Sequence, residues 1–326
     1  MRSVEVIEPG IQTTIQDYPG RRGMLAQGFF PAGPMDHFAL RAANLVVGNP
    51  ESAAALEVTL GNFALRLEHD AAIAVCGADA DLTADDAPFA TWESHRFAAG
   101  TVIRIGVAPG PGFRFYLAVD GGFDVPLLFG SRATYTMGAL GGLDGRPLQA
   151  GDRLPLGEPG SDGDGRRFRA GARPPYSRVW EVRAMRGPQA APDYLTENDM
   201  QTLFGRDWPI DRNSNRTGVR LESHRFEWAR QGGGIAGGHP SNILDNSYPV
   251  GAINVNGDLP VILGPDGPTA GGFVVAATVI HADFWKIGQF RPVGDTVRFR
   301  EVSIDEAIAA DRELDAALGD VSLEAA

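Results

Sequence analysis

The sequence predicts a mainly β fold, with two β-rich domains and a few short helices. The chain has 326 residues, which is enough for two domains that each bury a core. Its apolar segments are short and rich in β-branched and aromatic residues, and 42 glycines and 23 prolines stand mostly between them. Short strands joined by tight turns have this pattern, and they form barrels or sandwiches rather than alternating βαβ units.

Seven segments are expected to be strands, because each is a short apolar run between turn-forming residues. They lie in both halves of the chain, as two β-rich domains require. The segments are Ala55–Leu60, Ala71–Cys76, Thr101–Val107, Phe113–Val119, Trp180–Met185, Leu259–Leu263 and Gly272–Ile280.

Three helices are expected from the residues at their ends. Asp36 is a good N-cap for a helix that stops at Gly48, and a second helix runs from about Thr196 to Phe204. Ser303 and Glu306 have the spacing of a capping box, in which each side chain accepts the backbone N–H of the other residue. They predict the start of a third helix.

The segment from Gly157 to Tyr176 is the predicted boundary between the domains. It is rich in glycine, proline and charged residues, and no apolar periodicity runs through it, so we interpret it as a linker or long loop. The predicted divisions are a first barrel domain at 1–157, a second at 177–302, and a C-terminal helix and tail at 303–326.

A weak internal repeat favours two related barrels. Gly145–Leu154 and Gly288–Val297 each contain a Gly-Asp turn at the same interval before a strand. Each half also carries Gly-Gly-Phe upstream of that turn, beginning at Gly121 and Gly271. A cleft between two such barrels is the expected place for a ligand.

The charge of the chain argues against two classes of partner. It has 29 basic and 41 acidic residues, a net charge of −12. A protein that binds nucleic acids or anionic membranes needs clustered positive charge on its surface. No signal core is visible, and no stretch has the roughly 20 apolar residues that span a bilayer, so we expect a cytoplasmic protein. The one cysteine, Cys76, is expected in the core, and no metal site is predicted.

Lys286 is the only lysine of the chain. Its surroundings, Trp-Lys-Ile, fit neither a phosphate-binding loop, nor the lysine that carries biotin, nor an amidase with a Ser-Ser-Lys arrangement. We therefore expect this chain to bind no cofactor by itself. If ATP with a metal ion or biotin takes part, another chain supplies the nucleotide site or the biotin tether.

Two polar blocks of the first half could bind a substrate. The loop at 12–20 and Gly33-Pro34-Met35-Asp36 could offer backbone N–H groups at a helix N-terminus, although Asp36 could equally serve only as the cap. Arg132 follows a Gly-Ser turn and could clamp an acid through two hydrogen bonds. A structural arginine that bridges loops is the alternative.

Two further blocks carry turn formers directly beside strands. The run at 212–221 includes Asn215 and Arg216, which offer an amide and a guanidinium group to a planar, amide-like substrate. The run at 265–273 is a rigid glycine-rich turn in which Asp266 can accept hydrogen bonds. Plain turns are the alternative interpretation of both.

The remaining two blocks hold the candidate proton carriers. His239 stands in Gly-Gly-His-Pro-Ser-Asn, beside Ser241 and Asn242, and imidazole titrates near neutral pH. It could also be a structural turn residue. Lys286 has a compact, tunable amine that arginine cannot replace, although a single lysine could also be an accident of arginine-rich composition.

The order of these six blocks resembles one family. It is the biotin-dependent carboxyltransferase-like family, which includes allophanate hydrolase subunit 2, the C subunit of 5-oxoprolinase and the carboxyltransferase domain of urea carboxylase. The resemblance runs from Ile11 to about Arg300. Members more often have Ser and Leu where Thr269 and Ala270 stand here, a difference that can change the shape of the pocket.

This resemblance implies tandem cyclophilin-like β barrels and a protein that works with others. Similar proteins act with a smaller B subunit, and often with an A subunit, as a hydrolase that opens 5-oxoproline to glutamate with ATP. Fused relatives transfer a carboxyl group from carboxybiotin to urea, and some relatives are described as antagonists of a kinase inhibitor. The substrate is therefore expected to be a small amide or ureido compound.

The expected site combines residue chemistry with this resemblance. The expected catalytic residues are Lys286, His239 and Asp266, which would polarise a carbonyl or move a proton. The expected substrate-binding residues are Asp36, Arg132, Asn215, Arg216, Ser241 and Asn242.

Overall fold

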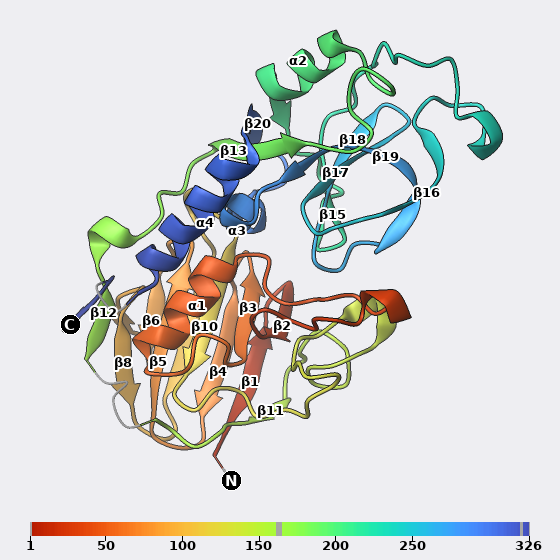
Figure 1. The fold of residues 1–326 in the computed structure, drawn as a ribbon. Coiled ribbons are helices and arrows are strands. Elements are labelled where there is room, and N and C mark those ends of the chain that lie inside the picture. The colour runs from red at the N-terminus through yellow and green to blue at the C-terminus, as the bar shows by residue number, and fades with distance from the viewer. Residues whose placement is uncertain (1, 161–164, 320–321, 326) are drawn as a thin grey trace. The chain divides into compact units, whose positions relative to one another are not determined.

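The computed structural model describes residues 2–160, 165–319 and 322–325 (Figure 1). The fold is mainly β, as the sequence predicts, and the chain divides into two compact units. The first unit comprises Met1–Met24, Pro31–Tyr176 and Asp315–Ala326, and the second comprises Leu25–Phe30 and Ser177–Leu314. The first unit is thus assembled from three separate stretches of sequence.

Two large antiparallel sheets form most of the first unit. One has the strand order β11-β1-β4-β9-β6-β7, and the other has the order β2-β3-β10-β5-β8. Their apolar faces share one core, to which both sheets contribute buried side chains such as Val6, Leu65, Val58 and Leu117. The strands are β1 (Ser3–Pro9), β2 (Gln12–Gln16), β3 (Ala55–Thr59), β4 (Phe63–Leu67), β5 (Ala71–Gly77), β6 (Leu82–Ala84), β7 (Ala87–Phe89), β8 (Ser94–Phe97), β9 (Val102–Ile105), β10 (Arg114–Val119) and β11 (Arg153–Pro155).

The sheet that begins with β2 is buried on both faces. Successive side chains of a strand point to opposite faces of the sheet. The residue that follows each apolar core residue therefore lies on the face away from that core. On that other face, Thr14, Glu57, Tyr116 and Cys76 are paired in one row across four strands, and all are buried. Helix α1 (His37–Val46) lies across these strands in Figure 1, and Asp36 caps it as predicted.

The expected linker contains part of the first unit. Within it, β12 (Arg166–Phe168) pairs with β21 (Leu323–Ala325), and Phe168 is fully buried. The Phe168 ring packs at 5.7 Å from Phe38 of α1 and at 5.6 Å from Trp92. One phenylalanine in a basic run has no periodicity, which is why the sequence indicated only a linker; residues 161–164 lie outside the described part of the chain.

The second unit is built on an eight-stranded sheet of order β14-β20-β13-β19-β17-β18-β15, with β16 paired to β19. The β13–β20 pair is parallel and the other pairs are antiparallel. The strands are β13 (Val179–Arg186), β14 (Asp207–Pro209), β15 (Gly218–Arg220), β16 (Asn242–Ser247), β17 (Ala252–Asn256), β18 (Leu259–Leu263), β19 (Ala270–Val279) and β20 (Thr296–Glu301).

The repeated Gly-Asp turns have similar local structures in sheets of different topology. Asp152 accepts the N–H of Gln149, and Asp295 accepts the N–H of Arg291, so each carboxylate closes the turn that leads into a strand. However, β11 joins an antiparallel pair and β20 a parallel one. The repeat therefore describes a shared turn, and the strand orders of the two units differ.

In the described part of the chain, three further α-helices follow α1. The expected helices appear as α2 (Glu197–Gly205), with a capping box at Thr196, and α4 (Ile304–Ala317), where Ser303 and Glu306 bond reciprocally. The sequence analysis did not predict α3 (His281–Gln289), which begins after Ile280 without any side-chain cap. None of the helices in the described ranges is long and apolar enough to cross a membrane.

Replacing Phe168 tests whether the expected linker belongs to the first unit. We expect Phe168→Ala to lower the free energy of unfolding by about 3–5 kcal/mol, because it leaves a cavity between α1 and Trp92. Urea denaturation followed by tryptophan fluorescence measures this loss. Ile11→Ala is the control, since Ile11 is 70% exposed and its loss should change little. Equal stability of the two variants would contradict the assignment.

Candidate functional site

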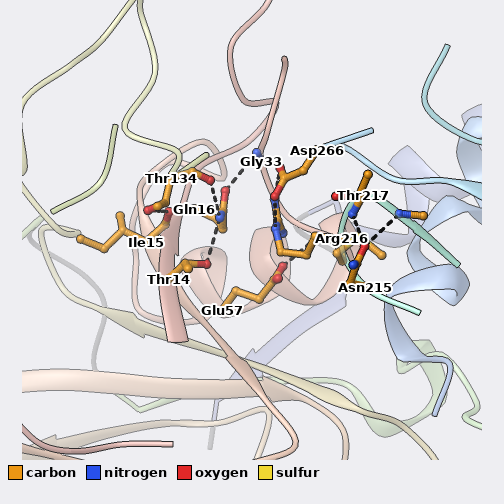
Figure 2. A network of polar contacts seen from close by, with 12 residues as sticks. Thr14, Ile15, Gln16, Gly33, Glu57, Thr134, Asn215, Arg216, Thr217 and Asp266 are labelled. Atoms are coloured by element: carbon orange, nitrogen blue, oxygen red, sulfur yellow. Dashed lines mark hydrogen bonds and ion pairs between the residues drawn. The ribbon is translucent and has the colours of Figure 1, made fainter. Parts of the chain in front are cut away.

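A buried ion pair joins two of the predicted blocks in the second unit. Arg216 Nε lies 2.8 Å from Asp266 Oδ2 and Arg216 Nη2 lies 2.9 Å from Asp266 Oδ1, so the pair is bidentate (Figure 2). Their side chains are only 4% and 3% exposed. A buried charge is stable only when it is paired, so the structure ties the run at 212–221 to the turn at 265–273.

Backbone hydrogen bonds hold the same two loops in place. Asn215 Oδ1 accepts the N–H groups of Thr217 and Gly218, which makes a local Asx turn directly before β15. The N–H of Gly264 donates to the Thr217 carbonyl, and β15 pairs with β18. Asn215, Arg216 and Asp266 are therefore brought together at one end of two neighbouring strands.

The His239 loop is a separate, ordered turn of this unit. His239 Nδ1 accepts the backbone N–H of Ser241 at 3.1 Å and lies 2.9 Å from the Ser241 hydroxyl. Because Nδ1 is an acceptor, the neutral ring carries its proton on Nε2. Ser241 is fully buried and its hydroxyl also accepts the N–H of Gly257, while Asn242 begins β16. The imidazole itself is exposed.

Lys286 is held by structural contacts on α3. Its Nζ donates to the Glu181 carbonyl at 2.9 Å and lies 3.1 Å from Asp283 Oδ1. Asp283 also forms a bidentate pair with Arg183 and is almost fully buried. Burial alone would raise the pKa of Asp283, but hydrogen bonds from Arg183 and the charge of Lys286 outweigh burial and lower it. Among the described contacts, none joins Lys286 to His239 or Asp266.

In the first unit, the buried polar row supports the Gly33–Asp36 loop. Glu57 Oε2 accepts the N–H of Met35 at 2.8 Å and the Tyr116 hydroxyl at 2.6 Å, and Tyr116 Oη accepts the N–H of Asp36 at 2.7 Å. Arg114 lies 3.4 Å from Glu57 and supplies the compensating charge. Burial first, and then the negative charge of Glu57, raise the pKa of Tyr116 well above its ordinary value.

Gln16 holds the other side of this loop. Its Oε1 accepts the N–H of Gly33 at 3.0 Å, and its Nε2 donates to Thr14 Oγ1 and to the Thr134 carbonyl (Figure 2). With Met35 and Asp36, three N–H groups of the predicted binding loop are thus used by side chains of the same unit. The loop is rigid, but these groups are already engaged.

Asp36 and Arg132 also have structural partners. Asp36 is fully buried; its Oδ1 accepts the N–H of Ala39 at the start of α1, and its Oδ2 lies 3.4 Å from the Tyr176 hydroxyl. Arg132 donates to Asp124 at 2.5 Å and to the Val125 carbonyl. Both residues fit the structural alternatives stated for them above, and direct contact with a substrate remains a prediction.

Sequence reasoning missed Glu57 and Tyr116, and it named Gln16 only as part of the loop at 12–20. Glu57 and Tyr116 are polar residues inside otherwise apolar strands, which was a usable signal. Their pairing across β3 and β10 could not be read from the sequence, because register depends on the folded sheet. In the described residues, no three His, Cys, Asp or Glu side chains gather in a way that could hold a metal ion.

Comparison with known proteins shows that the chain is similar to members of one family. The family model described as "Carboxyltransferase domain, subdomain A and B" matches residues 27–301. A putative urea carboxylase of Emericella nidulans is 40% identical over 98% of this chain, but the match spans only 26% of that protein. The C subunit of the Escherichia coli 5-oxoprolinase is 34% identical over 94% of both chains. The crystal structure of the K. lactis urea amidolyase has a TM-score of 0.91 and 38% identity, covering 99% of this chain and 21% of that one.

Breaking the buried ion pair should destabilise the second unit. We expect Asp266→Ala and Arg216→Ala each to cost about 3–5 kcal/mol, because each removes one partner of a buried bidentate ion pair. The double variant should cost less than the sum of the two, as a double-mutant cycle in urea measures. The control is Asp207→Ala, which breaks an equally bidentate but exposed pair with Arg298 and should cost at most about 1 kcal/mol. Additive single effects at Arg216 and Asp266 would contradict the coupling.

The lowered pKa of Asp283 predicts a pH-dependent stability. The folded pKa lies below the unfolded value of about 3.9, so the stabilisation is present above that value and is lost as the pH falls through the folded pKa. The stability difference between wild type and Asp283→Asn should therefore be largest near neutral pH and shrink in acid. Asp305→Asn, at an exposed position of α4, is the control for the loss of one carboxylate charge. A difference that is constant with pH would refute this prediction.

Proposed function

The chain belongs to the family of carboxyltransferase domains with subdomains A and B, and from this premise we propose that it is one component of a multi-subunit enzyme that acts on a small amide. In the specific form of the proposal, it works as the C subunit of an ATP-dependent 5-oxoprolinase, a hydrolase that opens 5-oxoproline to L-glutamate. The observation that carries this form is the match to the C subunit of 5-oxoprolinase over 94% of both chains.

The polar loops of the second unit suit a planar amide. Opening a lactam requires water to attack the carbonyl carbon and a proton to reach the leaving nitrogen. His239 is our candidate for that proton in its imidazolium form, in which Nδ1–H would donate to the Ser241 hydroxyl oxygen at 2.9 Å. The exposed Nε2–H, which has no described partner, would then give its proton to the leaving nitrogen and leave a neutral ring. Asn215 and Arg216 would hold the amide, with Ser241 and Asn242 orienting the His239 loop.

The structure changes the roles that we assign to Asp266 and Lys286. Both Asp266 oxygens are bonded to Arg216, so we propose Asp266 as a positioning residue that fixes the guanidinium. Lys286 is bonded to Asp283 and to the Glu181 carbonyl, and it would likewise act through the position of α3. These assignments leave His239 as the proposed proton carrier.

We propose that the nucleotide is bound by partner chains that resemble the B and A subunits of 5-oxoprolinase. ATP needs donors for its phosphates and usually carboxylates for its metal ion. The described residues contain no cluster suited to such an ion. We therefore derive no step through ATP in this chain.

A second candidate function is carboxyl transfer from carboxybiotin to urea or a similar amide. It is favoured by the higher identity, 40%, to a putative urea carboxylase and by the TM-score of 0.91 to the K. lactis urea amidolyase. The chain spans about a quarter of that urea carboxylase. Biotin would then arrive on a separate carrier, because Lys286 is the only lysine and it is tied to Asp283.

Reconstitution tests the proposed function. The purified chain is assayed alone and with its neighbour-encoded partners for ATP hydrolysis that depends on 5-oxoproline and for release of glutamate. We expect turnover only in the mixture, and His239→Gln in the mixture should lower kcat/KM by at least about 100-fold, the usual contribution of a general acid or base. Turnover by the chain alone at the rate of the mixture would disprove the multi-subunit proposal.

The same mixture distinguishes the other functions. Loss of carboxyl groups from a carboxylated biotin carrier, dependent on urea or another amide, would establish the carboxyltransferase instead. If neither reaction occurs, binding of the chain to a partner that inhibits a kinase would favour the regulatory function.

A further inference from the structure

The second unit has a pocket next to the His239 loop. Its volume is about 360 Å³, and its lining includes Gln189, Tyr194, Arg230, Ile243, Leu244 and Asp245. None of the residues assigned above to catalysis or substrate binding lines it. The volume is sufficient for a small organic molecule.

Arg230 provides a fixed positive charge in this pocket. Its Nε donates to the Pro240 carbonyl at 2.8 Å, and its Nη2 donates to the Asn242 carbonyl at 2.5 Å. The guanidinium also stacks on the Tyr194 ring, 4.4 Å from its centroid. All these partners are neutral, and within the described ranges no carboxylate pairs with Arg230, so its charge is held in one position without being neutralised.

Gln189 adds a neutral donor, and hydrogen bonds to its side-chain oxygen fix the orientation of the amide. The backbone N–H of Val275 donates to the Gln189 side chain at 2.9 Å, and only the amide oxygen can accept that bond. Asn246 Nδ2 donates to the same oxygen at 3.1 Å. The Gln189 Nε2 group therefore remains a donor, and it has no described partner. Gln189 and Arg230 both line the pocket, so it presents two kinds of donor that a carboxylate accepts.

Asp245 provides the opposite charge. Its Oδ1 accepts only the neighbouring N–H of Asn246, and in the described part of the chain no cation pairs with it. Ile243 and Leu244 precede it on β16, and Leu244 is 74% exposed. An exposed apolar side chain beside an unpaired carboxylate and a fixed guanidinium is suited to a ligand that carries both charges and an aliphatic group.

We propose that this pocket binds a free α-amino acid with an aliphatic side chain, through Arg230 and Gln189 at its carboxylate and Asp245 at its ammonium group. A single cation argues against phosphates and dicarboxylates, and Asp245 would repel a ligand that carries only negative charge. The lactam nitrogen of 5-oxoproline has no charge, so that compound lacks the group that Asp245 would bind. The proposal therefore concerns a ligand other than 5-oxoproline.

The test compares three ligands on the full chain by isothermal titration calorimetry. L-Leucine has both charges, 4-methylpentanoate lacks the amine, and 3-methylbutylamine lacks the carboxylate. We expect leucine to bind at least about tenfold more tightly than either analogue, because each analogue loses one charge-assisted contact. Absence of leucine binding, or equal affinity for leucine and an analogue, would overturn the proposal.

Asp245→Asn identifies the site. Asp245 is exposed and its described contact is local, so this variant should fold normally. Asp245→Asn should bind leucine about as weakly as the wild type binds 4-methylpentanoate. Its affinity for 4-methylpentanoate should be no lower than that of the wild type. Asp305→Asn removes the same charge on α4 and should leave leucine binding unchanged. Wild-type affinity for leucine in Asp245→Asn would place any binding elsewhere and refute the site.

Discussion

A buried charge must be neutralised or fully hydrogen-bonded, and this requirement organises the loops of both units. In the second unit it joins Arg216 to Asp266, and in the first it surrounds Glu57 with Arg114 and the Tyr116 hydroxyl. Each arrangement fixes loops that lie far apart in sequence. The candidate site therefore depends on polar groups that are already paired with one another, and these groups set the geometry more than they offer free ligands.

The same requirement gives Lys286 and Asp36 structural partners, and their catalytic and binding roles stay predictions. The single lysine suggested a catalytic amine, but Lys286 contacts Asp283 and a carbonyl of β13. Asp36 likewise serves as a cap with both oxygens close to donors of its own unit. His239 differs, because only one of its ring nitrogens is used. For the candidate proton carrier, we therefore give more weight to an exposed imidazole with one nitrogen held in place than to a residue that is merely rare in the chain.

Much of the fold could be predicted from the sequence because its signals are local. Three helices begin with side-chain contacts within one turn, made by Asp36, Thr196 and the Ser303–Glu306 pair. The expected strands are formed by short apolar runs. The failures concern long-range contacts. The burial of Phe168 depends on α1, and the pairing of Glu57 with Tyr116 depends on strand register, neither of which a local pattern contains. The order of the six blocks identified the family although most of their individual roles could not be assigned.

The pairing of β12 with β21 has a consequence for synthesis of the chain. These strands stand more than 150 residues apart, and the whole of Ser177–Leu314 is translated between them. A ribosome working from the N-terminus thus makes the second unit before it delivers the last strand of the first. Until then β12 lacks its partner strand beside the aromatic cluster of Phe168. Synthesis of the first unit begins earlier but ends later than that of the second. The time during which the first unit lacks its last strand is therefore set by the length of the second unit.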